Sequence, residues 1–260
     1  MDWLWSRWPQ EEKRILGSGH ALVLLDYDGT LTPIASSPEQ AKLPPAIKSV
    51  LRRLSLIPRV TVALISGRPL AELRRFVGLS NLTYVGHHGL EMWQGGRRTA
   101  VVVPRSSREA LSRVRPILAG LVKDVPGAHL EDKGLSLALH YRLVRTSHVA
   151  RLKAGIRRAV APFVRSDILS LLNGKKIVEV RPGLNWTKGD AVLRLVKRMR
   201  HQRLLSIYIG DDRTDEDAFD ALIDGITIRV GAHRRSKARY YVRNVGEVAT
   251  FLEWIASRLA

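Results

Sequence analysis

Five short apolar runs divide the chain, and each ends in a polar turn that contains glycine. The runs are "ALVLLDYDG", "RVTVALISGRP", "LTYVGHHG", "LLSIYIGDD" and "GITIRVG". Continuous apolar character over roughly four to eight residues is typical of strands that are covered on both faces, as in a parallel sheet. The pattern therefore predicts that these runs are buried strands.

Helical patterns lie between several of these runs. "PPAIKSVLRRLS" begins with prolines that suit a helix entry, and "LAELRRFVG" ends at a glycine that suits a helix C-terminus. Strands that alternate with helices predict an α/β fold with a doubly wound parallel sheet. Ligands bind beyond the carboxyl ends of the strands in such sheets. We therefore expect Asp26, Ser66, His88 and Asp211 near a ligand site.

The middle of the chain has a different pattern. "SREALSRVRPILAGLVKDVPG" and "SHVARLKAGIRRAVAPF" are helical patterns, and each is followed by a segment typical of a strand, "AHLEDKGLSLALHYR" and "KKIVEVRPG". The first of these strands alternates between apolar and polar positions, which predicts one polar face. These two helix–strand pairs predict an α+β insert over residues 105–183, within a core made of 1–104 and 184–260.

Composition sets the class of protein. The chain has 260 residues, 45% of them hydrophobic, which suffices for a sizeable core. It contains no cysteine, which excludes disulfides, thiolate nucleophiles and cysteine metal clusters. No uncharged run approaches the roughly 18 residues of a membrane span. The N-terminus lacks the basic-then-apolar order of a signal peptide. We therefore expect a cytoplasmic protein without a membrane span.

The formal charge of +19 indicates a strongly basic surface. Such a surface suits nucleic acid, an anionic membrane or acidic small molecules. The basic residues are scattered through amphipathic segments and are not interleaved with aromatic residues that would stack on bases. We therefore expect a solvated basic face and no nucleic-acid partner. We interpret Trp3, Trp5 and Trp8 as a packing arm or a disordered end in preference to a membrane anchor.

Acidic residues follow two of the predicted strands. Asp26 and Asp28 end the first run, and five acids lie within seven positions from Asp211 to Asp217. Close carboxylates repel one another and favour a divalent cation or a shared proton. Mg²⁺ is typically held by one or two carboxylates together with substrate phosphate oxygens. A strand-end turn and helix capping are the alternatives, but capping does not explain why acids begin where a strand ends.

Residues of the opposite polarity follow other elements. "ISGRP" provides Ser66 and Arg68, so that a hydroxyl, backbone N–H groups and a guanidinium can hold phosphate oxygens. Lys188 lies at a helix start, where the helix dipole disfavours a cation. We interpret it as a counter-charge to nearby carboxylates and a phosphoryl group, and an exposed surface lysine is the alternative.

The motifs together resemble those of a known group of enzymes. The set "DYDGT", "ISGR", Lys188 and "GDDRTDED" resembles the four motifs of the haloacid dehalogenase (HAD) superfamily of phosphotransferases. The strings "GHHGLE", "VEVRP", "NWTKGDAV" and "YIGDDRTDEDAF" are similar to those of trehalose-6-phosphate phosphatases, in the same order. The resemblance implies a Rossmann-like core with a mobile α+β cap. It also implies Mg²⁺-dependent hydrolysis of trehalose 6-phosphate to trehalose and phosphate, in trehalose biosynthesis.

The resemblance also implies roles for the acidic residues. Asp26 would be the nucleophile that forms an aspartyl-phosphate, and Asp28 the general acid and base. Asp211 would ligate Mg²⁺ together with Asp26 and the backbone carbonyl of Asp28. Asp215 would act through a metal-bound water, which completes the expected metal set.

The phosphoryl oxygens and the sugar would be held by other residues. Ser66 and Lys188 would hold the phosphoryl oxygens and stabilise the intermediate. Together with Arg68, the residues expected to bind the substrate are His88, Gly89 and Glu91 in the core and Glu131, Lys133 and Glu179 on the cap. For His140 and Arg142, sugar binding and ordinary cross-strand pairing both stay open.

Other functions stay open at this stage. The nearest is a related HAD sugar phosphatase that acts on sucrose-phosphate or mannosyl-3-phosphoglycerate. A different class is a basic nucleic-acid-binding protein, in which Asp26 has no role. An inactive regulatory HAD domain is disfavoured because every expected catalytic position is filled. A trehalose-phosphate synthase partner is a further hypothesis.

Overall fold

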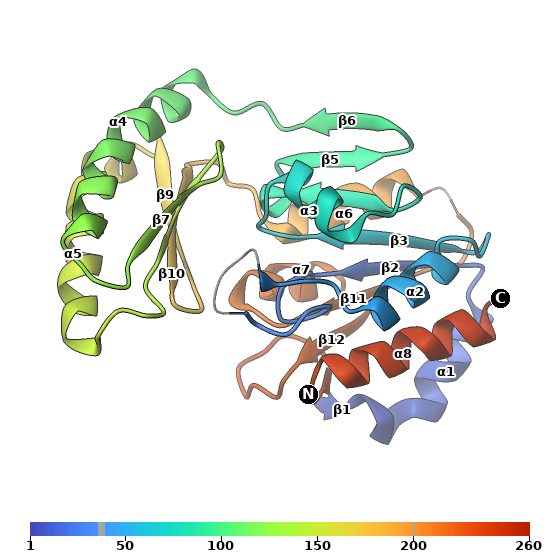
Figure 1. Cartoon of the computed structure of the whole chain (residues 1–260). Coiled ribbons are helices and arrows are strands. Elements are labelled where there is room, and N and C mark those ends of the chain that lie inside the picture. The colour runs from blue at the N-terminus through green and yellow to red at the C-terminus, as the bar shows by residue number, and fades with distance from the viewer. Residues whose placement is uncertain (36–39, 200) are drawn as a thin grey trace. The chain divides into compact units, whose positions relative to one another are not determined.

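The computed structural model of the chain describes residues 1–35, 40–199 and 201–260 (Figure 1). It divides into two units, one of Met1–Ala100 with Trp186–Ala260 and one of Val101–Asn185. Each unit has a hydrophobic core formed by its own residues. No helix of the described residues is long and apolar enough to cross a membrane.

The larger unit is built on a mainly parallel sheet. Within the described residues this sheet has nine strands in the order β1-β13-β12-β11-β2-β3-β4-β5-β6. All pairs from β1 to β4 are parallel, whereas β5 and β6 pair antiparallel. The strands are β1 (Asp2–Trp3), β2 (His20–Leu25), β3 (Val60–Ile65), β4 (Thr83–Gly86), β5 (Glu91–Gln94), β6 (Arg97–Ala100), β11 (Leu204–Gly210), β12 (Ile226–Val230) and β13 (Tyr240–Val242). The carboxyl ends of β11, β2 and β3 therefore lie along one edge.

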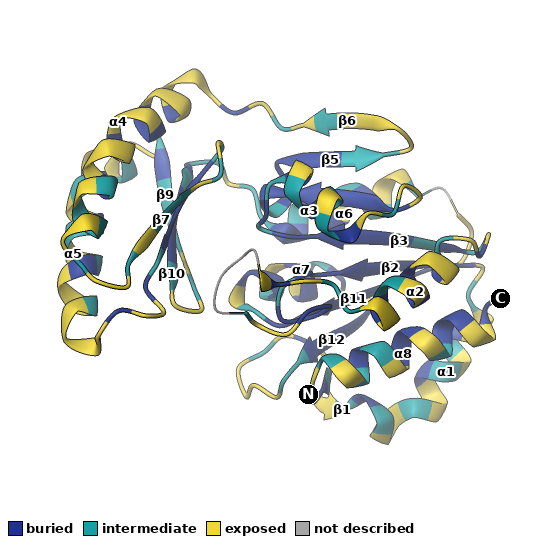
Figure 2. Cartoon of the chain, in the orientation of Figure 1, coloured by how far each residue is buried: buried dark blue, intermediate teal, exposed yellow. Residues whose placement is uncertain are grey.

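Helices cover both faces of this sheet, which confirms the doubly wound α/β architecture. The helices are α1 (Trp8–Gly17), α2 (Pro45–Leu54), α3 (Leu70–Val77), α6 (Lys188–Arg198), α7 (Glu216–Ala221) and α8 (Val245–Arg258), with short 3-10 turns η1 (Leu4–Arg7), η3 (His87–Gly89) and η4 (Arg213–Asp215). Alternate residues of β2 belong to different cores. Val23 and Leu25 share one core with α2 and α8. Leu22 and Leu24 share the other core with α6 and α7, so that β2 is buried on both faces (Figure 2).

The apolar runs predicted the inner strands and missed the outer ones. The predicted strands correspond to β2, β3, β4, β11 and β12, and all are confirmed. The strands β1, β13, β5 and β6 have two to four residues each. Strands this short carry no continuous apolar run of the length that marks a buried strand in a sequence.

The tryptophans near the N-terminus form a packing arm. β1 pairs with β13, and the Trp3 Nε1 donates a hydrogen bond to Glu247 at 3.1 Å. The ring centroid of Trp8 lies 4.7 Å from that of Trp5 and 4.6 Å from that of Trp254. These contacts, together with the strand pairing, pack the segment against the core of the larger unit.

The smaller unit is an α+β layer with an antiparallel sheet. Two helices, α4 (Arg105–Lys123) and α5 (Thr146–Arg165), share one core with a four-stranded sheet in the order β7-β8-β10-β9 within the described residues. Its strands are β7 (His129–Asp132), β8 (Leu137–His140), β9 (Leu169–Gly174) and β10 (Ile177–Pro182). The first predicted strand segment spans both β7 and β8, the second corresponds to β10, and β9 was not predicted.

The polar face predicted for this sheet is largely withdrawn from water. Ser136, which precedes β8, and Ala138 are buried, and His140 is half-buried. The Ser136 hydroxyl donates a hydrogen bond to Glu179 on β10, which satisfies both polar groups away from water.

Candidate active site

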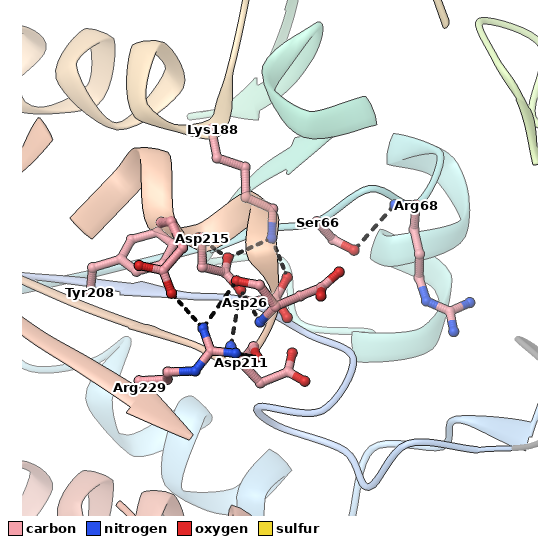
Figure 3. Close-up of polar contacts among 10 residues, drawn as sticks. Asp26, Ser66, Arg68, Lys188, Tyr208, Asp211, Asp215 and Arg229 are labelled. Carbon is pink, nitrogen blue, oxygen red and sulfur yellow. Dashed lines mark hydrogen bonds and ion pairs between the residues drawn. The ribbon is translucent and has the colours of Figure 1, made fainter. Parts of the chain in front are cut away.

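Three carboxylates converge at the carboxyl edge of the larger sheet (Figure 3). Asp26 follows β2, Asp211 follows β11, and Asp215 ends the turn η4. One carboxylate oxygen of each lies within 4.8 Å of the others, and all three residues are buried. Because β2 and β11 are adjacent parallel strands, the residues that follow them meet at the same place.

A buried lysine links two of these carboxylates. The Lys188 Nζ lies 2.6 Å from Asp26 Oδ1 and 2.7 Å from Asp215 Oδ1. Lys188 is the first residue of α6, whose N-cap is Thr187 in a capping box with Asp190. The capping box fixes the helix start, and its first residue points toward the carboxylates. Lys188 is therefore a counter-charge, as the sequence predicted, and is not an exposed lysine.

Asp215 accepts four hydrogen bonds. Its Oδ1 accepts from Lys188 and from the Tyr208 hydroxyl at 2.7 Å each. Its Oδ2 accepts from the backbone N–H groups of Asp211 and Asp212 at 2.9 Å each. Asp212 and Asp215 also form a capping box at η4. The acidic residues after β11 therefore both cap η4 and contribute carboxylates to the site.

The two carboxylates that share Lys188 have opposite pKa shifts. Burial raises the pKa of Asp26 well above its usual value. Lys188 lowers this pKa, but the negative charges of Asp215 and Asp211 raise it and so offset part of the effect of Lys188. Burial also raises the pKa of Asp215, but Lys188, Tyr208 and the backbone donors outweigh it and hold that pKa below its usual value. Asp215 is the better solvated anion because more donors face it. A cation beside Asp26 and Asp211 would favour ionised Asp26.

The carboxylate triad fits a divalent metal ion. Carboxylate oxygens are the ligands that hard divalent cations prefer, and Lys188 balances only part of the negative charge. The absence of a side chain at Gly29 lets the Asp211 carboxylate lie against the turn after β2, because a Cβ on this residue would overlap that carboxylate. The residues Asp26, Asp211 and Asp215 could therefore hold a metal ion.

Arg229 of β12 holds the backbone of the acidic loop. Its Nη2 donates to the Asp211 carbonyl at 2.6 Å, and its Nη1 contacts Glu216 Oε1 at 2.6 Å and the Asp212 carbonyl at 3.4 Å. No role was predicted from the sequence for Arg229 or for Tyr208. Each is a polar residue within an otherwise apolar run, and this was the available signal.

Asp28 lies apart from the triad and pairs with Arg68. Its Oδ2 accepts from Arg68 Nε at 2.8 Å, and its Oδ1 accepts from Arg68 Nη2 at 2.7 Å. Arg68 also pairs with Glu72, one turn into α3. Burial lowers the pKa of Arg68, but Asp28 and Glu72 outweigh it and raise that pKa above its usual value. The sequence pattern predicted Arg68 on phosphate oxygens, whereas here the guanidinium faces these two carboxylates.

Two sequence motifs pack against each other beside the triad. Ser66 follows β3, is buried, and accepts a hydrogen bond at its Oγ from the backbone N–H of Arg68 at 3.2 Å. A Cβ on Gly67 would lie 2.5 Å from His88 Nε2, so the absence of a side chain at Gly67 admits the His88 ring. The "ISGR" and "GHHG" segments are thus brought together, as expected for Ser66 and His88.

Gly89 and Glu91 contact protein groups in this structure. A Cβ on Gly89 would overlap the Trp186 Nε1, so this glycine allows η3 to pack closely on the segment that leads into α6. Glu91 pairs with Arg98 and lies 3.7 Å from His87 Nε2. Gly89 therefore packs η3 against the start of α6, and Glu91 contacts the neighbouring His87 and Arg98.

The smaller unit gathers the other predicted residues in two groups. Glu179 lies 3.8 Å from Lys133 Nζ, and both side chains are largely buried. Glu131 of β7 contacts His140 Nε2 of β8 at 2.8 Å. His140 therefore has a cross-strand partner, and cross-strand pairing was one of the two roles left open for it. The Arg142 side chain instead donates a hydrogen bond to a backbone carbonyl.

Comparisons with known proteins agree with this arrangement. Residues 24–245 match the family described as trehalose-phosphatase. The chain is 35% identical to an uncharacterised glycosyl hydrolase of Mycobacterium tuberculosis, over 95% of this chain and 19% of that protein. It is 32% identical to the trehalose-phosphate phosphatase of Mycolicibacterium paratuberculosis, over 94% of this chain and 64% of that protein. It thus spans less than two thirds of either relative.

A solved structure extends the likeness to three dimensions. The C-terminal domain of the Candida albicans trehalose-6-phosphate phosphatase superposes with a TM-score of 0.86 at 25% identity. The match covers 96% of each chain. The similarity therefore includes both units of this chain.

Proposed function

The chain belongs to the trehalose-phosphatase family, and we propose from this premise that it hydrolyses trehalose 6-phosphate to trehalose and phosphate. The observation that carries the proposal is the convergence of Asp26, Lys188, Asp211 and Asp215 at the carboxyl edge of a parallel sheet. These residues combine a nucleophile, a buried cation and an acidic group able to hold a metal.

Asp26 is the proposed nucleophile. One of its oxygens attacks the phosphorus atom, the bond from phosphorus to the sugar oxygen breaks, and an aspartyl-phosphate forms. Lys188 contacts Asp26 directly and can also face a phosphoryl oxygen, while the buried Ser66 hydroxyl lies at the end of the adjacent strand β3. These groups supply fixed charge and dipoles where negative charge develops.

Asp28 is the proposed general acid and base. Its carboxyl group gives a proton to the leaving sugar oxygen in the first step. It then takes a proton from the water whose oxygen attacks phosphorus as the bond to Asp26 breaks. One residue can serve both steps because the first step leaves it in the carboxylate form that the second step needs.

We propose Mg²⁺ as the metal ion. Asp26, Asp211 and the Asp28 backbone carbonyl would hold it, and Asp215, whose oxygens already accept four protein hydrogen bonds, would support it through a water. When bound, Mg²⁺ would offset the repulsion between an anionic nucleophile and a phosphate dianion.

Selectivity for the sugar is assigned to residues of both units. Glu131, Lys133 and Glu179 offer charged hydrogen-bonding groups on the small sheet. His88, Gly89 and Glu91 belong to the segment beside Ser66 and Lys188. A disaccharide presents many hydroxyl groups, and charged side chains with fixed partners suit their recognition.

A phosphate-release panel tests the proposal. Purified protein is given trehalose 6-phosphate, glucose 6-phosphate, sucrose-phosphate and mannosyl-3-phosphoglycerate, each with and without Mg²⁺. We expect preferential release from trehalose 6-phosphate that depends on Mg²⁺. Asp26→Asn should lower it by at least about 10³-fold while the fold is retained. Equal turnover of glucose 6-phosphate and trehalose 6-phosphate would exclude the substrate, and activity that survives Asp26→Asn would exclude the mechanism.

Two finer points stay predictions. One is a cytoplasmic location. The other is a trehalose-phosphate synthase as a partner, which an affinity measurement between the two purified proteins would test.

A further inference from the structure

The Arg68 side chain has a fixed and unusual environment for a residue beside a phosphate site. Its Nε and Nη2 donate in parallel to the two oxygens of Asp28, at 2.8 and 2.7 Å, and its Nη1 pairs with Glu72. The side chain is only 7% exposed. Two parallel hydrogen bonds between a guanidinium and a carboxylate fix the orientation of both groups.

Aromatic rings hold the guanidinium from another side. The Arg68 Cζ lies 4.8 Å from the ring centroid of Phe76 and 5.3 Å from that of Tyr27. Tyr27 lies between Asp26 and Asp28 in the chain, and its hydroxyl donates to the Ala41 carbonyl at 2.8 Å. Carboxylates and aromatic rings together therefore fix the position of the guanidinium. The Asp28 side chain is 42% exposed and so is accessible to solvent.

The direction of the side chain argues against direct phosphate binding. Figure 3 shows the Arg68 guanidinium pointing away from Lys188 and the Asp26 carboxylate. Its charge is already balanced by Asp28 and Glu72. A guanidinium that faces two carboxylates has little net attraction left for a phosphate dianion.

We infer that Arg68 is a positioning residue that holds the Asp28 carboxyl group in one orientation for proton transfer. The inference rests on the proposed function, since it gives Arg68 a purpose only if Asp28 is the acid and base. In the first step the Asp28 O–H gives its proton to the leaving oxygen as the bond from phosphorus to that oxygen breaks. In the second step the carboxylate takes a proton from the attacking water. The two hydrogen bonds from Arg68 occupy one lone pair on each Asp28 oxygen and leave another to carry this proton.

The leaving group provides the test. A sugar alkoxide needs a proton to depart, whereas the phenolate of 4-nitrophenyl phosphate does not. We expect Arg68→Gln to lower kcat/KM for trehalose 6-phosphate by at least about tenfold, a part of what general acid catalysis supplies. The value for 4-nitrophenyl phosphate should change by less than about threefold, because that step does not use the Asp28 proton.

A double-mutant cycle separates positioning from other roles. If Arg68 acts through Asp28, Arg68→Gln should have little further effect in an Asp28→Asn background. Arg68→Lys should restore only part of the activity, because an ammonium cannot make the paired hydrogen bonds. It also keeps the charge should Arg68→Gln fail to fold. Arg74→Gln is the matched control, since Arg74 lies on α3, the helix that begins two residues after Arg68, and its guanidinium stacks on Trp93 at 3.7 Å. It should leave both substrates unaffected.

Three results would overturn the inference. They are an equal loss on both esters, a full additive loss in the Asp28→Asn background, and a loss confined to KM with weaker inhibition by inorganic phosphate. The last would assign Arg68 to phosphate binding.

If the wild type releases no phosphate from trehalose 6-phosphate, the proposed substrate fails by itself. The same cycle then compares glucose 6-phosphate with 4-nitrophenyl phosphate, so the two hypotheses fail separately.

Discussion

Tyr208 shows how a single hydroxyl supports the charged centre. It is wholly buried in β11 and donates to Asp215 Oδ1, the atom that also accepts from Lys188. Burial and the neighbouring Asp215 raise the pKa of Tyr208 well above its usual value, so its proton stays available as a donor. A neutral donor thus helps to keep Asp215 ionised.

We predict that Tyr208→Phe lowers both stability and turnover. A buried hydrogen bond to a charged group contributes about 1.5–3 kcal/mol, and denaturant unfolding should show a loss of this size. The kcat for trehalose 6-phosphate should fall because Lys188 and Asp215 shift together. Tyr84→Phe is the control. Tyr84 is also buried, but its hydroxyl donates to the backbone carbonyl of Leu79 and not to a residue of the triad. It should cost about 0.5–1.5 kcal/mol without a change in kcat, and equal kinetic effects of both variants would contradict the prediction.

His20 at the start of β2 makes stability depend on pH. Its Nε2 lies 2.9 Å from Thr61 Oγ1, and its ring stacks on that of His201 with centroids 3.9 Å apart. Burial lowers the pKa of His20, and the charges of His201 and Arg59 lower it further. The unfolded chain therefore binds a proton at this residue more readily than the folded chain does.

The sign of the effect follows from that difference. The contribution of His20 to stability is present above its ordinary pKa of about 6.5 and is lost as the pH falls through and below that value. We predict that the free energy of unfolding declines between pH 7.5 and pH 5, and that His20→Gln flattens this decline. Urea unfolding across that range measures it, and an unchanged slope in the variant would contradict the assignment.

At the level of strands and turns, the turns after the central strands decide whether the site forms. The turn after β2 closes with a hydrogen bond from the Gly29 N–H to the Thr32 carbonyl at 2.8 Å. Gly29 has φ +84°, a region that favours glycine, and its α-carbon lies against the Asp211 carboxylate. Two turns from adjacent strands therefore interlock through a residue without a side chain.

We predict that Gly29→Ala impairs both the fold and the metal site. A methyl group would overlap the Asp211 carboxylate, and the positive φ adds strain of about 1–3 kcal/mol. Activity should fall by more than about tenfold, as expected for misplacement of a catalytic group by about 1 Å, and the Mg²⁺ concentration for half-maximal activity should rise.

Gly95→Ala separates strain from overlap. Gly95 has φ +55°, but a Cβ added to it would meet no atom of the described residues within 4 Å. This variant should therefore cost stability only. Similar activity losses in the Gly29 and Gly95 variants would contradict the role of crowding at Asp211.

Sequence patterns predicted elements where a strand or helix has one strong periodic signal. The apolar runs identified β2, β3, β4, β11 and β12, and the glycine after "LAELRRFV" marked the end of α3, where Gly78 has φ +62°. β7 and β9 were not separated from their surroundings. Strands of this kind depend on antiparallel partners that no local pattern specifies.

Across the whole molecule, the positive charge is the dominant feature. The chain has a formal charge of +19, and the three triad carboxylates are buried and do not offset positive charge on the surface. Much of the exposed surface therefore carries uncompensated positive charge, and like charges destabilise the compact state. The ion pairs at the triad are buried and are screened less by salt than exposed charges are.

We predict that added sodium chloride raises the Tm. Raising the ionic strength to 0.15 M shortens the Debye length to about 8 Å, which screens repulsion between exposed cations. Thermal unfolding at low and moderate salt measures the shift. Uncharged sucrose is the comparison, since it stabilises folded proteins without screening charge. A Tm that falls with salt would mean that exposed ion pairs outweigh the repulsion.

Local sequence patterns were enough to predict the residue types of the site, whereas the proposed reaction class came from the resemblance of these motifs to a known family. Acids after two strands, a hydroxyl after a third and a lysine at a helix start are local patterns, and parallel strands bring their ends to one edge. Which groups contact one another became clear only from the packed fold. The pairing of Lys188 with both Asp26 and Asp215, the hold of Arg229 on the acidic loop and the pairing of Arg68 with Asp28 were not predicted in these forms. Such contacts depend on side-chain directions and on the exclusion of water, which are set only when the elements pack.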